Sequence, residues 1–359
     1  MATQTTPTTQ EERPQEVPAS PLARGSESLL VILSRYREAS IAVVAILIVA
    51  FFQFRNSTFL TTQELSVVLR DTGRIGFIAA AEVLLMITGE IDLSVGSTFA
   101  LAPYVMGLLT TFWGVPLPFS ALVAALVGVV VGLVNGAITV KFHVPSLITT
   151  LGTFFLLAGL AVTIANSQPI QTPVQEPFNQ IFGENLFSPT DPLFSWHGLT
   201  AFTPFLWAVL VVGVTTLVLT RTTFGLHTIA TGSNLLGSRE IGVRTDRIKI
   251  YNFMIVGGIA AASGIINAIQ YGSADPIAGG PTLTLQAIAA AVIGGTSLFG
   301  GSGTTIGALI GAFVVATLNN GLVLIGAQAT QSDIYLGAAI VVAMILNVRV
   351  SSLRARRRR

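Results

Sequence analysis

Long apolar runs recur along this chain, separated by short segments that contain glycine or polar residues. A transmembrane helix needs about 20 mostly apolar residues, and runs of about this length indicate helices rather than the alternating strands of a membrane barrel. The pattern predicts an all-α membrane protein with about ten transmembrane helices. They are expected at residues 40–54, 73–89, 94–113, 118–139, 146–165, 204–220, 251–270, 283–298, 304–325 and 334–348.

Three segments do not fit a spanning helix. Residues 1–27 are rich in Thr, Gln, Pro and Glu, so we expect a disordered cytoplasmic N-terminal tail. Residues 55–74 are polar with a few Leu and Val, which predicts a separate helix at the membrane interface. Residues 351–359 form a basic cytoplasmic tail that would anchor to anionic lipid rather than to nucleic acid, which leaves residues 28–350 as the transmembrane domain.

The basic residues predict the orientation of the spans. If the N-terminus is cytoplasmic, every Lys and Arg except Arg55, Arg70 and Arg74 falls on the cytoplasmic side. Basic residues concentrate in the cytoplasmic loops of membrane proteins, and the inverted topology would reverse this distribution. Both termini are therefore predicted to be cytoplasmic.

Composition agrees with a membrane protein and excludes several kinds of chemistry. Hydrophobic residues make up 52% of the chain, charged residues only 10%, and the mean hydropathy is +0.74. The chain has no cysteine, and its three histidines are far apart in sequence, so we expect no disulfide, no iron–sulfur cluster and no local histidine metal site. It has neither a convincing Ser/His/Asp set nor a G-x-x-x-x-G-K-[ST] phosphate loop. We therefore expect no catalytic residues and no cofactor bound by this chain.

Acidic and polar residues interrupt the apolar pattern at Gly89-Glu90-Ile91-Asp92-Leu93-Ser94-Val95-Gly96-Ser97. A charge inside a bilayer is costly, so such carboxylates normally face the protein interior or a wet cavity. The stretch is either a connection at the membrane surface or a broken helix beside a transport path. Polar residues that could line such a path, or simply bond to neighbouring helices, are Glu82, Glu90, Asp92, Ser94, Asn135, Thr150, Thr153 and Gln286.

Glycine spacing predicts close helix packing. Glycines four residues apart lie on one helix face and allow two backbones to approach, so we interpret these as packing positions rather than ligand contacts. They are Gly128, Gly132 and Gly136 in the fourth predicted span, and Gly303, Gly307 and Gly311 at and within the ninth.

The order of the spans suggests an inverted repeat. Spans two to five and seven to ten each contain four helices and enter the membrane from opposite sides. In each half the second helix follows a polar turn with glycine, at 89–97 and at 272–284. Inverted repeats are typical of transporters, which commonly bind substrate at the repeat interface.

The predicted cytoplasmic loop 224–243 is too apolar for a passive linker. Asn234 is suited to cap a short helix from Leu235 to Ile241, which Gly242 would end. A short surface helix with apolar and charged sides fits a groove on a partner protein, although a solvated connector has a similar composition. The residues of this candidate docking site are Gly232, Asn234, Leu235, Arg239, Glu240 and Gly242.

Three segments together resemble one family. Residues 89–97 are similar to the G-G-I-D-L-S-V-G-S element of ribose-type permeases, the membrane subunits of bacterial ABC sugar importers. Residues 287–303 resemble their A-I-A-A-x-V-I-G-G-T-S-L-x-G-G-x-G element, and residues 224–243 resemble their coupling segment. The order of the segments and the number of spans agree with this family of ribose, xylose and arabinose type.

The resemblance implies an ABC importer permease fold, a location in the bacterial inner membrane, and several partners. These would be a second permease copy, a cytoplasmic ATPase that uses ATP and Mg²⁺ and grips the Leu235–Ile241 helix, and a periplasmic or lipid-anchored sugar-binding protein. The substrate would be a monosaccharide such as ribose, xylose, arabinose or galactose, carried by alternating access. No nucleic acid is expected as a partner.

The chain also departs from the family pattern. Glu90 replaces the usual glycine, Leu226 replaces a common basic residue, and Gln286 stands where an acid is frequent. Two other readings remain open: a permease for nucleosides or branched-chain amino acids within the same superfamily, and a stand-alone ion-coupled carrier that uses Glu82, Glu90 or Asp92.

Overall fold

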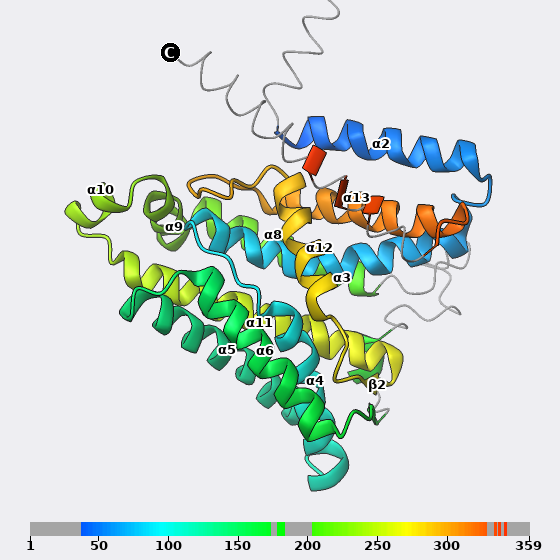
Figure 1. Cartoon of the computed structure of the whole chain (residues 1–359), viewed down its shortest axis with the longest axis horizontal. Coiled ribbons are helices and arrows are strands. Elements are labelled where there is room, and N and C mark those ends of the chain that lie inside the picture. The colour runs from blue at the N-terminus through cyan, green and yellow to red at the C-terminus, as the bar shows by residue number, and fades with distance from the viewer. Residues whose placement is uncertain are drawn as a thin grey trace, which may run out of the picture.

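The computed structural model describes residues 37–173, 178–183 and 203–328, and a few positions between 334 and 342 (Figure 1). Both predicted tails and most of the tenth predicted span lie outside these residues. In chain order the helices and strands are α2 (Arg37–Arg55), α3 (Thr62–Ile87), α4 (Val95–Trp113), α5 (Leu117–Lys141), α6 (Ser146–Ala165), β1 (Ile170–Gln171), α7 (Phe178–Phe182), α8 (Thr203–Arg221), α9 (Thr223–Ser233), α10 (Leu235–Glu240), α11 (Thr245–Tyr271), β2 (Ser273–Ala274), α12 (Gly280–Ile293) and α13 (Thr305–Leu324).

The helical membrane class is confirmed, whereas the count of ten spans is not. Among the described residues, seven helices are long and apolar enough to cross a membrane. They are α2, α4, α5, α6, α8, α11 and α13. The predicted eighth span is shorter than expected, because α12 has only 14 residues and cannot cross a bilayer alone.

The prediction of a separate interfacial helix before the second span is wrong. Residues 62–74 of this segment continue into the second span as one helix, α3, which runs 26 residues from Thr62 to Ile87. All of its charged residues except Glu82 lie in its first half, where Asp71 bonds to Arg74 and to Asn320 of α13. Asp71 and Arg74, which suggested a surface segment, therefore have partners within the bundle.

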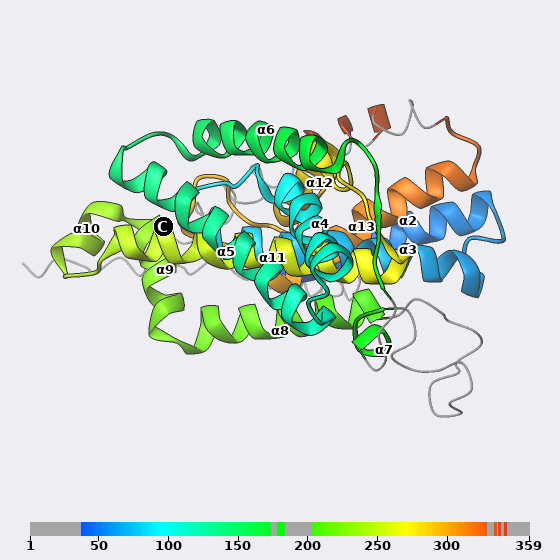
Figure 2. The same cartoon turned by 90° about the horizontal axis from the view of Figure 1, so that it is seen from below.

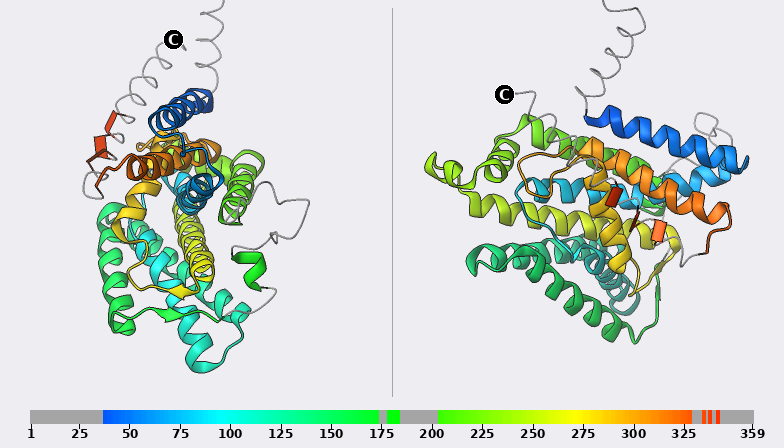
Figure 3. Two further views of the ribbon diagram at one scale, coloured as in Figure 1. Left: turned by 90° about the vertical axis from the view of Figure 1, so that its right-hand side faces the viewer. Right: turned by 45° about the horizontal axis from the view of Figure 1, so that its top comes forward.

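The packing of the helices follows the predicted repeat. In the repeat, α3 to α6 correspond to α11, α12, α13 and the tenth predicted span. The two largest contacts between helices are those of α5 with α11 and of α3 with α13. Under the repeat, each of these two pairs is the counterpart of the other. The repeat likewise exchanges the α4–α11 contact with the α3–α12 contact. Figures 2 and 3 show α3 and α11 in the interior, with α6 and α8 along opposite sides.

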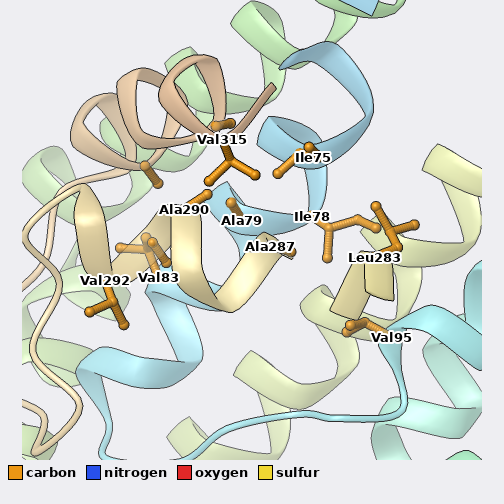
Figure 4. Packing of buried hydrophobic residues seen from close by; sticks show 14 of the residues in the cluster. Ile75, Ile78, Ala79, Val83, Val95, Leu283, Ala287, Ala290, Val292 and Val315 are labelled. Atoms are coloured by element: carbon orange, nitrogen blue, oxygen red, sulfur yellow. The ribbon is translucent and has the colours of Figure 1, made fainter. Parts of the chain in front are cut away.

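Small side chains let α12 lie inside the bundle. Figure 4 shows Ala287 and Ala290 of α12 facing Ala79 and Val83 of α3, with Val315 of α13 beside them. All five side chains belong to the main buried apolar cluster. Because alanine leaves little distance between the backbones, the broken helix packs closely without a polar seam.

The glycines of α5 and α13 lie at helix contacts. A Cβ at Gly128 or Gly132 would overlap backbone carbonyl oxygens of α11, and one at Gly136 would lie 2.9 Å from an α11 Cα atom. Added Cβ atoms at Gly307 and Gly311 would overlap the backbone of α12 and its C-terminal end, and one at Gly303 would lie 2.8 Å from a methyl carbon of Thr296.

Two adjacent glycines of α11 provide a test of this packing. A Cβ at Gly257 would overlap the Gly128 carbonyl oxygen, whereas one at Gly258 would meet only a Val129 methyl group, at 2.9 Å. We expect Gly257→Ala to lower the free energy of unfolding by about 1–3 kcal/mol, as overpacking typically does, and Gly258→Ala to change it little. Thermal melting of the two purified variants measures the difference, and equal melting temperatures would contradict the close backbone contact.

Candidate functional site

The stretch 88–94 is a non-helical break between α3 and α4, and it runs beside α6. The backbone N–H of Ile91 donates to Ser146 Oγ at 3.3 Å, and that of Leu93 donates to Thr150 Oγ1 at 3.0 Å. Two residues of the extended break cover about 6 Å, and so does one turn of α6. Hydroxyl groups four residues apart on α6 can therefore accept from every second N–H group of the break. The hydroxyl groups of α6 thus supply acceptors that the broken helix lacks.

Asp92 is the centre of a buried side-chain network. Its Oδ1 accepts the backbone N–H of Ser94 at 2.8 Å and the Ser94 hydroxyl at 2.6 Å. The Asn135 amide donates to the Ser94 Oγ at 2.9 Å and, more weakly, to both Asp92 oxygens at 3.4–3.5 Å. Thr153 donates to Asn135 Oδ1 at 2.7 Å. The network joins the start of α4 to α5 and α6, and Asp92, Ser94 and Asn135 are completely buried.

The other half of the repeat begins its short helix in a similar way. Asp275 Oδ1 accepts the N–H of Ile277 at 3.0 Å, two residues further on, just as Asp92 accepts from Ser94. The starts of α4 and α12 then meet, because a Cβ at Gly96 would overlap the Gly280 carbonyl oxygen, and the Gly96 N–H donates to Thr284 Oγ1 at 3.1 Å. Two helix N-termini, whose dipoles favour negative charge, therefore converge near Asp92.

Glu82 of α3 lies beside this network without joining it. The side chain is completely buried, and neither carboxyl oxygen makes a hydrogen bond of normal geometry within the described residues. Its nearest charged neighbour is Asp92. A buried polar group without a partner loses its hydration without compensation. This cost makes Glu82 a source of instability in the described conformation.

Glu82→Met is therefore expected to raise the melting temperature of the purified chain. Methionine has a similar shape and no desolvation cost, and a buried polar group without a partner costs about 1–3 kcal/mol. Glu82→Gln serves as the control, because it removes the charge but keeps a buried polar group. A lower melting temperature for Glu82→Met would mean that the carboxyl has a stabilising partner in the membrane.

Glu90 points to a different helix. Its carboxylate forms an ion pair with Lys249 of α11, with 2.5 Å between the Glu90 oxygen and the Lys249 nitrogen. Their side chains are only 14% and 16% exposed. The turn at Gly89, where φ is +84°, precedes this contact. The break is thus attached to α6 through its backbone and to α11 through Glu90.

The structure brings together most of the predicted polar residues. Asp92, Ser94, Asn135 and Thr153 form the side-chain network, Thr150 bonds to the break, Glu82 is adjacent and Glu90 faces α11. Gln286 is buried on α12 outside this group. Sequence reasoning missed Ser146, Thr284 and Lys249. Ser146 could have been found as a hydroxyl one turn before Thr150 at the start of α6.

Helices α9 and α10 form an arm that extends at one end of the bundle (Figures 1 and 2). The predicted cap of α10 is confirmed, because Asn234 Oδ1 accepts the N–H of Gly237 at 2.9 Å. Gly242 follows with a φ of +88°, a conformation that favours glycine. Residues 223–233 are also helical, which the sequence did not predict. Arg239 pairs with Asp246 of α11 at 2.6 Å, while Glu240 is exposed.

The arm exposes apolar side chains. At α10, Leu236 and Ile241 are 72% and 78% exposed, and Leu226 in the first turn of α9 is 62% exposed. Exposed apolar groups beside charged ones are typical of protein contact surfaces. We refer to Leu236 and Ile241 as the arm tip.

The C-terminal end of α9, just before α10, lies against both of the other motif segments. A Cβ at Gly232 would overlap the carbonyl oxygen of Ile87, the last residue of α3. The same carbonyl accepts the Gly301 N–H at 2.8 Å, and a Cβ at Gly300 would lie 3.1–3.2 Å from Gly89, Ile87 and Gly232 backbone atoms. We call this contact of Ile87, Gly89, Gly232, Gly300 and Gly301 the glycine junction. It joins, backbone to backbone, three segments that are far apart in sequence.

Comparison with known proteins identifies the family. The profile of the family described as "Branched-chain amino acid transport system / permease component" matches residues 64–344. This chain belongs to that permease family. No solved structure matches it.

Curated relatives match over nearly their full length. A xylose/arabinose import permease protein of Sulfolobus acidocaldarius is 34% identical over 89% of this chain and 87% of its own. An autoinducer 2 import system permease protein of Photorhabdus luminescens is 33% identical over 90% and 93%, and a probable ABC transporter permease protein of Escherichia coli is 34% identical over 91% and 95%. The resemblance to sugar-type importer permeases is thereby confirmed, and the chain is a multi-pass membrane transport component.

Proposed function

We propose that this chain is the membrane subunit of an ATP-driven importer for a monosaccharide, located in the cytoplasmic membrane with the α10 end facing the cytoplasm. The observation that supports this best is the glycine junction. It connects an arm with an exposed apolar tip to the break beside Asp92. A stand-alone ion-coupled carrier would leave the arm tip without a partner.

The relatives and the motif wording favour a sugar as substrate. Two of the relatives are described as importers of xylose/arabinose and of autoinducer 2, whereas the family description names branched-chain amino acids. The buried network of hydroxyl, amide and carboxylate groups offers both donors and acceptors, which suits a polyhydroxyl compound. Asp92, Ser94, Asn135 and Thr153 are the residues that we assign to the path.

The partner ATPase binds the arm tip. It supplies the ATP and Mg²⁺ chemistry, since this chain carries no phosphate loop. Closing of the ATPase moves α9 and α10, and the glycine junction passes this movement to α3 and to the break. ATP and substrate then favour different access states, which couples hydrolysis to import.

A second permease copy packs against α6. This helix exposes Leu151, Phe155 and Leu156, and added Cβ atoms at Gly152 and Gly159 would meet nothing within 4 Å. Glycine lowers helix stability by about 1 kcal/mol relative to alanine, so its use on an open face favours close approach of another helix. The translocation path then runs near the contact between the copies, on the inner side of α6 where its hydroxyls meet the break. A periplasmic or lipid-anchored binding protein delivers the substrate.

Affinity purification of the tagged chain from its native membrane tests the partners. We expect a Walker-motif ATPase and a binding protein in the eluate, and loss of the ATPase in a Leu236→Glu variant. Trp113→Glu is the matched control, because Trp113 is also a large apolar side chain and is 78% exposed. It is the last residue of α4, however, and lies next to the start of α5 rather than at the end of the bundle that carries α10. Retention of the ATPase by Leu236→Glu would contradict the docking role of the arm tip.

Reconstitution tests the energy source and the substrate. Proteoliposomes with the chain, its ATPase and the binding protein should take up one of labelled xylose, arabinose, ribose or galactose only when ATP is present. Leucine and uridine test the amino acid and nucleoside alternatives. Uptake by the chain alone under a proton or sodium gradient would contradict the importer and support the ion-coupled carrier.

A further inference from the structure

Two ion pairs occupy the first turns of α11 and face different partners. Asp246 accepts from Arg239 of α10 at 2.6 Å, and Lys249 donates to Glu90 of the break at 2.5 Å. Residues three apart on a helix lie on neighbouring positions of one face. The start of α11 therefore connects the arm to the break through side-chain charges, separately from the backbone contacts of the glycine junction.

The two pairs differ in their burial. The Arg239 and Asp246 side chains are 50% and 57% exposed, whereas those of Lys249 and Glu90 are 16% and 14% exposed. Solvent weakens an exposed pair, but removal of one partner of a buried pair leaves a charge without compensation. The inner pair is thus the stronger restraint on the position of the break.

Glu90 also has a direct covalent connection to the buried network. It follows Gly89, which has a positive φ, and Asp92 lies only two residues further on. A shift of Lys249 that pulls on Glu90 must move Asp92 or be absorbed by the bonds of Ile91 and Leu93 to α6. The carboxylate stands at a position where the family pattern usually has glycine, so other members with that pattern lack this connection.

We propose that Glu90 and Lys249 are positioning residues for transport: their ion pair fixes the break to α11 and transmits movements of the arm to the Asp92 network. The inference rests on the proposed ATP-driven import. It assigns to the pair a role in coupling rather than in contact with substrate.

Charge variants in reconstituted proteoliposomes with ATPase and binding protein test the pair. We expect Glu90→Gln and Lys249→Gln each to lower the ratio of substrate-stimulated to basal ATPase activity about tenfold, and sugar uptake by a similar factor. This is within the usual range of coupling between sites. Basal ATPase activity should be unchanged. The double variant Glu90→Lys with Lys249→Glu should regain most of the coupling. A merely structural role would instead lower basal and stimulated activities together.

Arg74→Gln is the matched control, because Arg74 pairs with Asp71 at 3.4 Å in the first half of α3, far along the chain from the break. This variant should have the same ratio of stimulated to basal ATPase activity as the wild type. The proposal would be overturned if the single variants of Glu90 and Lys249 kept the wild-type ratio, or if a folded double variant remained uncoupled. If the single variants do not fold, the double variant decides. Absence of ATP-dependent uptake in the wild type would instead contradict the proposed function.

Discussion

Replacing Asp92 by alanine is expected to lower the free energy of unfolding by about 3 kcal/mol or more and to abolish uptake, because each buried polar group left without a partner costs about 1–3 kcal/mol. The N–H and the hydroxyl of Ser94 would both lose their acceptor, and the Asn135 amide would lose its weaker bonds. Asp92 also places negative charge near the start of α4, where the helix dipole favours it. Melting of the purified variant and uptake in proteoliposomes measure the two effects.

Asp275→Ala is a matched control for this variant. Asp275 occupies the corresponding turn of the other half, accepts the N–H of Ile277, and is exposed to solvent. Water can replace its bond, so we expect a loss below about 1 kcal/mol. The stability loss of Asp92→Asn should lie between those of the two alanine variants. The new amide oxygen can still accept from Ser94, but the new amide nitrogen would face the amide nitrogen of Asn135, and both are donors. Equal melting of Asp92→Ala and Asp275→Ala would contradict the buried network.

The sequence predicted the helical membrane class, offered a broken helix at 89–97 as one of two interpretations, and suggested the repeat from the order of its spans. Apolar length identifies membrane helices, and the acidic stretch at 89–97 stands out against it. The cap at Asn234 was predictable because a helix start depends on a few neighbouring residues.

Long-range contacts could not be predicted from one sequence. Nothing local to Glu90 indicates Lys249, 159 residues away, as its partner. The polar residues between 55 and 74 suggested a surface helix, because the partner of Asp71, Asn320, is 249 residues away. The same limit applies to Thr284, whose hydroxyl meets Gly96 only through the packing of the two broken helices.

The glycine junction shows how the two kinds of information combine. Gly232, Gly300 and Gly301 are visible in the sequence as parts of separate glycine-containing segments, and each alone is explained by a tight turn or a helix end. Only the fold places all three against Ile87 and Gly89. The junction then requires glycine for close approach, not merely for backbone freedom.

Gly232→Ala is accordingly expected to uncouple the transporter. The new methyl group would overlap the Ile87 carbonyl oxygen, which already accepts the Gly301 N–H. Backbone atoms cannot rotate away as a side chain can, so the arm must shift at a cost of about 1–3 kcal/mol. We expect substrate stimulation of the ATPase to fall about tenfold or more, within the usual range of coupling between sites, while the ATPase still copurifies because the arm tip is unchanged.

Gly213→Ala in α8 provides the comparison, because its added Cβ would meet nothing within 4 Å. Its melting temperature and stimulation ratio should equal or exceed those of the wild type, since alanine favours the helix by about 1 kcal/mol. Coupling that survives Gly232→Ala would mean that the arm communicates with the break only through α11. In that case the Glu90–Lys249 pair would have to carry the whole signal, and its single variants should be fully uncoupled.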